Sequence, residues 1–412
     1  MTFPSLQRSA PSAAGASQER DVRLLLGGVA LSAAGNAIYL PLVLAQTGLA
    51  FSPLWASAVM FAVNAGRVGG SWLSARREAF APRSPLAAIV LEGVALASMA
   101  FAEHPAAIVV AATVAGFGAG CSYPALKHHL ILLAPDGKSR LFARLSIALR
   151  YGMAFGYLAG AAAAGLGLRT VLLGASGLFA AYALVVQVAL RAHRRTPTAR
   201  TASVARTAAP RVVLGGAQGA AGTIGIVAFW FLATQPIVLM SLYVPRYLPA
   251  VPVSMVFWVS TAVAIGMQHR VTSLADGERG HERLVMFGFA LMALTFLAMT
   301  VGHPTVIALL CSTIAWAASQ AFYGPSLDFL VCEGARRRGG AIDAAMSRQQ
   351  MSQTLGVMFG SWFAGVLFEC GERIGRPAFS GSVLAALSVA ALAFVSLGTM
   401  RRRRGSPATR SP

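Results

Sequence analysis

Residues 191–211 read RAHRRTPTARTASVARTAAPR, a polar and basic stretch near the middle of a 412-residue chain. The stretch has no apolar face, and its composition is typical of a flexible linker. On both sides of it, apolar runs of about 20 residues, the length that crosses a bilayer, follow one another along the chain. The sequence therefore predicts two membrane-embedded halves joined by a linker at 191–216.

Twelve apolar runs are long enough to cross a bilayer, six before the linker and six after it, and they predict an all-α membrane protein of 12 transmembrane helices. We expect them near 23–46, 52–74, 84–103, 105–128, 142–165, 168–190, 217–244, 251–269, 283–302, 304–329, 345–368 and 378–399. The predicted domains are a cytoplasmic tail at 1–22, a six-helix bundle at 23–190, the linker at 191–216, a second six-helix bundle at 217–400 and a basic tail at 401–412.

Composition supports the membrane assignment, and the positions of the cations explain the net charge of +20. Hydrophobic residues make up 56% of the chain and charged residues 12%, about half the charge of a soluble protein. Of the 34 Lys and Arg, four lie on one set of alternate loops and two inside apolar runs, which leaves 28 on the other loops and the tails. This asymmetry places both termini in the cytoplasm and the chain in an inner, or plasma, membrane. It also argues against nucleic-acid binding, which needs the cations on one soluble surface.

Motifs for catalysis are absent from the sequence. It contains no GxSxG, HExxH or Walker-type run, and an ATP-driven pump would need a nucleotide-binding domain that has no counterpart in this chain. The four cysteines are scattered without metal-ligand spacing, and they are Cys121, Cys311, Cys332 and Cys370. We therefore expect no enzyme activity, no cofactor and no metal site.

An internal repeat supports the division into two halves. Pro124 and Pro325 stand 201 positions apart, each followed closely by a leucine and a charged residue, and glycines recur at an offset of 200. Parallel repeats of this kind predict two bundles related by a pseudo-twofold axis along the membrane normal. Small residues spaced by four let helices approach closely. We assign that packing role to Gly152, Gly156, Gly160, Gly356 and Gly360.

With its two six-helix halves and basic linker, the chain resembles a major facilitator superfamily (MFS) permease, particularly the multidrug and metabolite efflux branch. That family carries a glycine, a Leu-Ala-Asp-Arg-like core and a basic turn between its second and third helices. Here residues 69–77 read GGSWLSARR, with the glycines and the basic turn but without the acid, and residues 273–280 read SLADGERG. The missing acid bears on the usual cytoplasmic gate, and the resemblance in topology covers about residues 20–400.

The resemblance implies a secondary transporter that works by alternating access. We expect proton-coupled export of a small organic solute, either a drug-like compound or an anionic or zwitterionic metabolite such as a siderophore. The alternatives are an importer of a small metabolite and a transport-inactive membrane sensor on the same scaffold. The expected partners are the solute, protons and the lipid bilayer, and we expect a monomer.

Charged residues at membrane depth are costly, on the order of 3 kcal/mol by insertion scales, so each is a functional candidate. Glu92 is the one carboxylate well inside a predicted span, and Arg67 lies at a similar predicted depth on the preceding span. The two could form a structural salt bridge. Alternatively, Glu92 could bind the coupled proton, with burial against Arg67 setting its affinity.

Three further charged residues are candidates for gating or substrate binding. Lys127 and Asp328 occupy equivalent places in the two halves and could latch them together, or could be two snorkelling side chains with separate partners. Asp328 is also a second candidate for proton coupling. Arg150 could bind an anionic solute through its planar donor fork, or could be a structural arginine satisfied by carbonyl or carboxylate groups.

Uncharged polar and aromatic residues on the expected cavity helices complete the candidate set. The resemblance to the family places helices 1, 4, 7 and 10 around the central path. Interhelical hydrogen bonding is the alternative role for each member of this set. The candidates for the substrate cavity, besides Arg150, are Asn36, Tyr39, Gln235, Gln320, Tyr323 and Gln353.

Overall fold

The computed structural model describes residues 13–76, 85–133, 138–194, 219–271, 277–301, 305–337 and 342–405. These residues form twelve α-helices and one short 3₁₀ helix, Ala164–Leu166. The helices are α1 (Ala13–Ala50), α2 (Pro53–Arg76), α3 (Leu86–Met99), α4 (Pro105–Leu133), α5 (Lys138–Ala163), α6 (Leu168–Arg194), α7 (Gly219–Tyr247), α8 (Val253–Val271), α9 (Gly277–Val301), α10 (Val306–Arg337), α11 (Ile342–Arg373) and α12 (Phe379–Gly405).

Every predicted span has its helix, and the largest difference is at the start of α1. The sequence predicted a tail over 1–22 and a helix from residue 23, whereas α1 begins at Ala13. Asp21 and Val22 are already buried, and Glu19 forms an ion pair with Arg144 of α5 at 3.0 Å. The predicted tail therefore ends too late: residues 13–22 already belong to the helix, and Glu19 of this stretch contacts α5.

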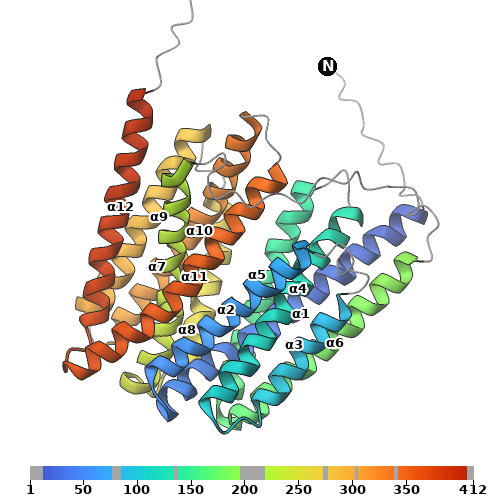
Figure 1. Cartoon of the computed structure of the whole chain (residues 1–412), viewed down its shortest axis with the longest axis horizontal. Helices are drawn as coiled ribbons and strands as arrows, with labels where there is room; N and C mark the ends of the chain where they lie inside the picture. Colours follow the sequence, from blue (N-terminus) through green and yellow to red (C-terminus); the bar gives the residue numbers. More distant parts are fainter. Residues whose placement is uncertain are drawn as a thin grey trace, which may run out of the picture.

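The helices assemble as two bundles of six, α1–α6 and α7–α12, which lie side by side in Figure 1. In the first bundle α1 packs on α5 and α6, and α4 packs on α2 and α3; in the second, α7 packs on α11, and α10 packs on α8 and α9. The corresponding helices of the two bundles thus have corresponding partners. This is the repeated architecture that the offset of 200 residues predicted.

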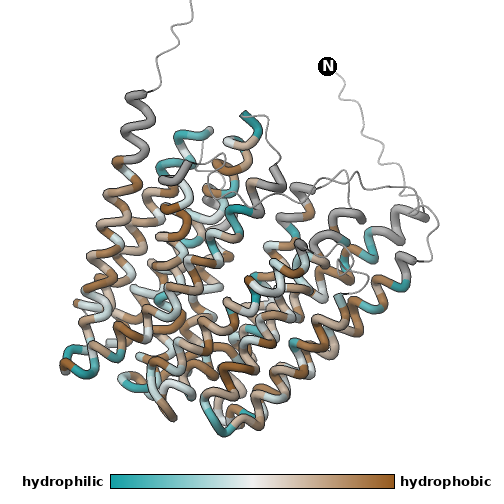
Figure 2. The backbone as a smooth tube through the Cα atoms, viewed as in Figure 1, coloured by the Kyte–Doolittle hydropathy of each residue, from teal (hydrophilic) through white to brown (hydrophobic). Residues whose placement is uncertain are grey.

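Apolar residues cover most of the length of the helices, and polar residues gather toward their ends (Figure 2). Among the described residues, eight helices are long and apolar enough to cross a membrane, namely α1, α4, α6, α7, α9, α10, α11 and α12. α3 and α8 supply shorter apolar segments. The chain is therefore a multi-pass membrane protein.

We name the two ends of the molecule by the chain segments that they carry. α1 begins and α12 ends at one end, which we call the termini side (Figure 1). The opposite end, the turn side, carries the described connections at 51–52, 100–104, 164–167, 248–252 and 374–378.

Glycines set how closely the helices pack inside each bundle. A Cβ added to Gly116 of α4 would lie 2.0 Å from the carbonyl oxygen of Val63 on α2, and one added to Gly120 would lie 2.3 Å from that of Arg67. Real Cβ atoms do not approach backbone so closely. The α2–α4 contact is therefore a backbone-to-backbone contact that only glycine permits.

The glycines predicted to serve helix packing lie in the same kind of contact. Gly152 and Gly156 face α1, where an added Cβ would lie 2.2 Å and 2.3 Å from carbonyl oxygens. Gly356 and Gly360 face α7, at 2.5 Å and 2.4 Å from carbonyl oxygens. Gly160 faces Ile38 of α1 and also approaches Ser254 of α8. The glycine series of α5 therefore packs mainly on its own bundle.

Candidate functional site

The two bundles touch near the turn side. The helix pairs that join them are chiefly α2 with α11, α5 with α8, and α1 with α7. Tyr157 packs on Phe257 with ring centroids 5.5 Å apart, and Phe61 packs edge-on against Trp362 at 6.1 Å. For the described residues, these ring contacts and the polar and glycine contacts between bundles lie in the halves of the helices nearer the turn side. We call this set of contacts the seam.

Two hydroxyls in the seam are buried without a hydrogen-bond partner. An added Cβ on Gly365 of α11 would lie 2.0 Å from the Ser57 hydroxyl, and one on Gly160 would lie 3.1 Å from the Ser254 hydroxyl, so both serines stand between the bundles. Within the described structure neither hydroxyl has a partner. Leaving a buried hydroxyl unpaired costs about 1–3 kcal/mol, so the seam is tight but incompletely satisfied.

A buried carboxylate lies inside the first bundle. Glu92 of α3 is only 2% exposed and accepts a hydrogen bond from the Asn36 amide at 3.4 Å. The same amide donates to the Ser32 carbonyl at 3.0 Å, and the hydroxyl of the buried Tyr39 donates to the Asn36 side-chain oxygen at 3.3 Å. Glu92 is thus joined to two predicted cavity residues of α1.

Arg67 and Tyr182 complete the surroundings of Glu92. Arg67, half-buried on α2, interacts electrostatically with both Glu92 and Tyr39. It forms no direct ion pair with Glu92 within the part of the chain that the structure describes, so the two charges are near but not bonded. Tyr182 of α6, which is not among the residues predicted from the sequence, also interacts with Glu92. We call Asn36, Tyr39, Arg67, Glu92 and Tyr182 the carboxylate cluster.

Close helix packing holds Glu92 in place. An added Cβ on Gly118 of α4 would lie 2.6 Å from the Ala88 carbonyl and 3.1 Å from the Glu92 backbone nitrogen. On the other side of α3, the Ser176 hydroxyl of α6 donates to the Gly93 carbonyl at 2.9 Å. These contacts fix the position of α3 between α4 and α6, and the carboxylate faces α1 as a consequence.

Three of the predicted cavity residues are half-buried. Arg150 lies on α5, Gln320 on α10 and Gln353 on α11. None of these side chains has a hydrogen-bond or ion-pair partner within the described part of the chain. A half-buried guanidinium without a protein partner keeps its donors available for an anion.

Two other candidates for the cavity are fully buried in this conformation. The Gln235 amide donates to the Gly360 carbonyl at 2.9 Å and thereby ties α7 to α11. Tyr323 of α10 stacks on Phe229 with ring centroids 3.4 Å apart, and its hydroxyl donates to the Gly225 carbonyl at 3.5 Å. Both are placed as interhelical contacts of the second bundle.

Gln235 and Gln320 differ in their contacts, so their replacement should affect stability differently. Gln235→Leu removes an interhelical hydrogen bond and should destabilise the protein by about 1 kcal/mol. Gln320→Leu breaks no protein hydrogen bond and should leave stability unchanged. Thermal unfolding of the purified variants in detergent measures both. Equal melting temperatures for the two variants would contradict the structural role of Gln235.

The structure describes one partner of the predicted Lys127–Asp328 latch. Asp328 of α10 is exposed and accepts a hydrogen bond from the Gln349 amide of α11. The side chain of Lys127, and with it the predicted latch to Asp328, lies outside the described residues, as do most of the linker at 191–216 and residues 1–12.

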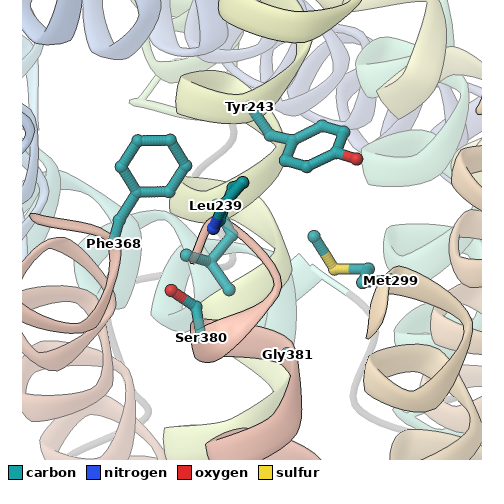
Figure 3. Close-up of a pocket in the computed structure, with 7 residues that line it drawn as sticks. Leu239, Tyr243, Met299, Phe368, Ser380 and Gly381 are labelled. Carbon is teal, nitrogen blue, oxygen red and sulfur yellow. The ribbon is translucent and has the colours of Figure 1, made fainter. Parts of the chain in front are cut away.

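A small pocket lies away from the carboxylate cluster, inside the second bundle (Figure 3). Its walls come from α7, α9, α11, α12 and the α11–α12 connection, with Leu239, Tyr243, Met299, Phe368, Pro377, Ser380 and Gly381 as lining residues. Most of the lining is apolar and no charged side chain contributes to it. We assign it to imperfect helix packing near the turn side.

A charged group at the seam was not predicted from the sequence. Arg246 of α7 forms an ion pair with Glu372 of α11, and its Nη2 donates to the carbonyl of Gly48 on α1 at 3.3 Å. In the sequence, Arg246 is one of the few cations of the sparsely charged loops. The signal that could have found it is the pairing of rare charges, since Glu372 lies just beyond the predicted span 345–368, on the same side as Arg246.

Comparisons with known proteins agree with this architecture. No family model matches the chain. Uncharacterized MFS-type transporters of two Mycobacterium tuberculosis strains, CDC 1551 / Oshkosh and H37Rv, are 26% identical to it over 213 residues, 50% of this chain and 49% of each relative. The matched part thus spans about half the length of these relatives.

Solved structures share the fold over nearly the whole chain. The nucleoside transporter NupG superposes with a TM-score of 0.65 at 14% identity and covers 93% of this chain and 99% of its own. The POT family transporter PepTSo gives 0.72 at 11% identity, with coverages of 94% and 99%. At these identities the likeness concerns the fold.

Two six-helix bundles that repeat one arrangement and meet along one side define the class of the protein, a polytopic membrane protein built like a solute transporter. Its fold is that of the major facilitator superfamily, the fold that the resemblance drawn from the sequence implied. The relatives and the structural neighbours are named as transporters, in agreement with the prediction that the chain is not an enzyme.

Proposed function

We propose that the chain is a secondary transporter that moves a small organic solute by alternating access. The observation that carries the proposal is the one-sided seam: the bundles are in contact near the turn side, which is the geometry of one end state of a rocking cycle. In an inner membrane with cytoplasmic termini, the orientation that the loop charges favour, the turn side is external. This conformation then faces inward.

We assign proton coupling to Glu92. A carboxylate at 2% exposure within the membrane is costly to ionise unless a cation lies near, and Arg67 supplies that cation without bonding to it directly. A change in the distance between Arg67 and Glu92 during rocking would therefore change the proton affinity of the carboxylate. Asn36 links this carboxylate to α1, one of the helices that join the bundles.

The proposed direction and solute class rest on the sequence resemblance and on two cations. Export is proposed because the sequence resembles the efflux branch, with import as the alternative. An anionic or zwitterionic solute is proposed because Arg67 and Arg150 are half-buried cations, and Arg150 has no partner within the described residues. Electrostatic attraction in a low-dielectric site favours negative groups there.

A two-stage experiment tests the proposal. Cells producing the chain should accumulate less of at least one anionic or zwitterionic compound from a test panel, and a protonophore should remove the difference. Proteoliposomes containing the purified chain should then show counterflow of the labelled compound. Absence of counterflow for every compound of the panel would favour the sensor, for which the missing acid at 69–77 is the supporting observation. Uptake in place of efflux would identify an importer.

A further inference from the structure

Arg246 stands where the two bundles meet, at the end of α7 on the turn side. Its guanidinium contacts two neighbouring helices: it pairs with Glu372 of α11, lies 5.6 Å from the ring centroid of Phe368 on the same helix, and donates to the Gly48 carbonyl of α1. α7 and α11 belong to the second bundle, and α1 belongs to the first. Arg246 thus makes a polar bond across the seam.

The acceptor in the first bundle is suited to a cation. Gly48 lies in the last turn of α1, which ends at Ala50, and the last four carbonyls of a helix have no partner within the helix. These carbonyls carry the negative end of the helix dipole, where a cation is favoured. α7 also lies close to Gly48, because an added Cβ there would lie 2.2 Å from the end of the Leu242 side chain of α7.

Glu372 orients the guanidinium of Arg246. It engages Nη1 while Nη2 reaches the Gly48 carbonyl, so one carboxylate orients the planar fork toward the other bundle. The two side chains are 27% and 26% exposed. They are therefore shielded more than an ordinary surface pair, for which measured contributions are small.

We propose that Arg246 is a latch that holds the turn side closed, with Glu372 as the residue that positions it. The bond to the Gly48 carbonyl exists only while the bundles are together at this side, whereas the pair with Glu372 lies within one bundle and persists when the seam opens. The latch therefore stabilises one end state of the cycle relative to the other. The inference rests on the proposed alternating-access cycle.

Distance measurements between the bundles test the latch without any solute. Spin labels replace the exposed residues Leu166 and Val301, on the turn side of the first and second bundles, in a background without the native cysteines. Removing a hydrogen bond to a charged group at a partly shielded site should raise the ratio of open to closed populations about fivefold. We expect Arg246→Ala to show this shift, and Glu372→Gln to show a smaller one.

The matched control is Arg169→Ala. Arg169 is another arginine near the turn side, but its guanidinium lies 4.3 Å from the ring centroid of Phe101 within the first bundle, so its removal should leave the distances unchanged. The charge exchange Arg246→Glu with Glu372→Arg is decisive. It restores an ion pair but places an acceptor beside the Gly48 carbonyl, so the seam should stay as open as in Arg246→Ala.

Two results would overturn the latch. One is a distance distribution for Arg246→Ala equal to that of Arg169→Ala, and the other is full restoration of the closed population by the charge exchange, which would assign the pair a structural role only. If Arg246→Ala does not fold, Arg246→Met, which keeps an unbranched side chain but has no donor for the Gly48 carbonyl, gives the same comparison. Because no solute enters the measurement, a failed latch is distinguishable from a failed transport proposal.

Discussion

Glu92→Gln is expected to abolish solute accumulation driven by the proton gradient while preserving counterflow. Glutamine keeps the size and the hydrogen-bonding capacity of the side chain but cannot bind and release the coupled proton. Each charge moved through about 100 mV supplies about 2.3 kcal/mol, equivalent to about a 50-fold concentration ratio. Losing one coupled proton should therefore lower the accumulation ratio by about that factor. Proteoliposomes with an imposed gradient, loaded with the solute identified by the export screen, measure it.

Glu103→Gln is the matched control for this variant. Glu103 is an exposed acid in the α3–α4 connection, so its neutralisation should leave the accumulation ratio unchanged. A Glu92→Gln protein that retains the full accumulation ratio would reduce the carboxylate to a structural partner of Asn36 and Arg67. Melting temperatures of the two variants show whether any loss of transport is a loss of folding.

Gly116→Ala should severely impair folding although it adds a single methyl group. The new Cβ would lie 2.0 Å from the Val63 carbonyl oxygen and 2.9 Å from the Val63 Cα, and backbone atoms cannot move aside as a flexible side chain can. Overpacking typically costs about 1–3 kcal/mol, and more where nothing can yield. We expect α2 and α4 to separate, with a sharp loss of monodisperse protein on size-exclusion chromatography.

Gly177→Ala on α6 is the control for Gly116→Ala, and we expect it to leave folding intact. An added Cβ at Gly177 would meet nothing within 4 Å, and alanine is favoured over glycine in a helix by about 1 kcal/mol. The control should therefore be neutral or slightly stabilising. Equal losses for the two variants would mean that general intolerance of added methyl groups, and not the α2–α4 contact, limits folding.

The helices were predictable because hydropathy along the chain reports directly on immersion in lipid. The start of α1 was not, since residues such as Glu19 and Asp21 look like a solvated tail until a neighbouring helix is placed beside them. Hydropathy carries no information about which polar residues of a tail contact a partner.

The sequence predicted which residues belong to the candidate site better than it predicted the contacts among them. Glu92, Asn36 and Tyr39 were selected individually, and the structure joins them by hydrogen bonds. The distance between Arg67 and Glu92 depends on side-chain directions, which predicted depth alone does not give. The burial of Gln235 against Gly360 likewise results from the packing of α7 on α11, helices far apart in the sequence.

The unpaired Ser57 and Ser254 hydroxyls bear on how readily the protein changes state. When the bundles part at the turn side, water can bind both groups, and the hydration regained offsets part of the apolar contact that is lost. A wholly apolar seam in the same place would regain no such hydration on opening. In the proposed cycle, the two serines would thus lower the cost of opening the seam at the turn side.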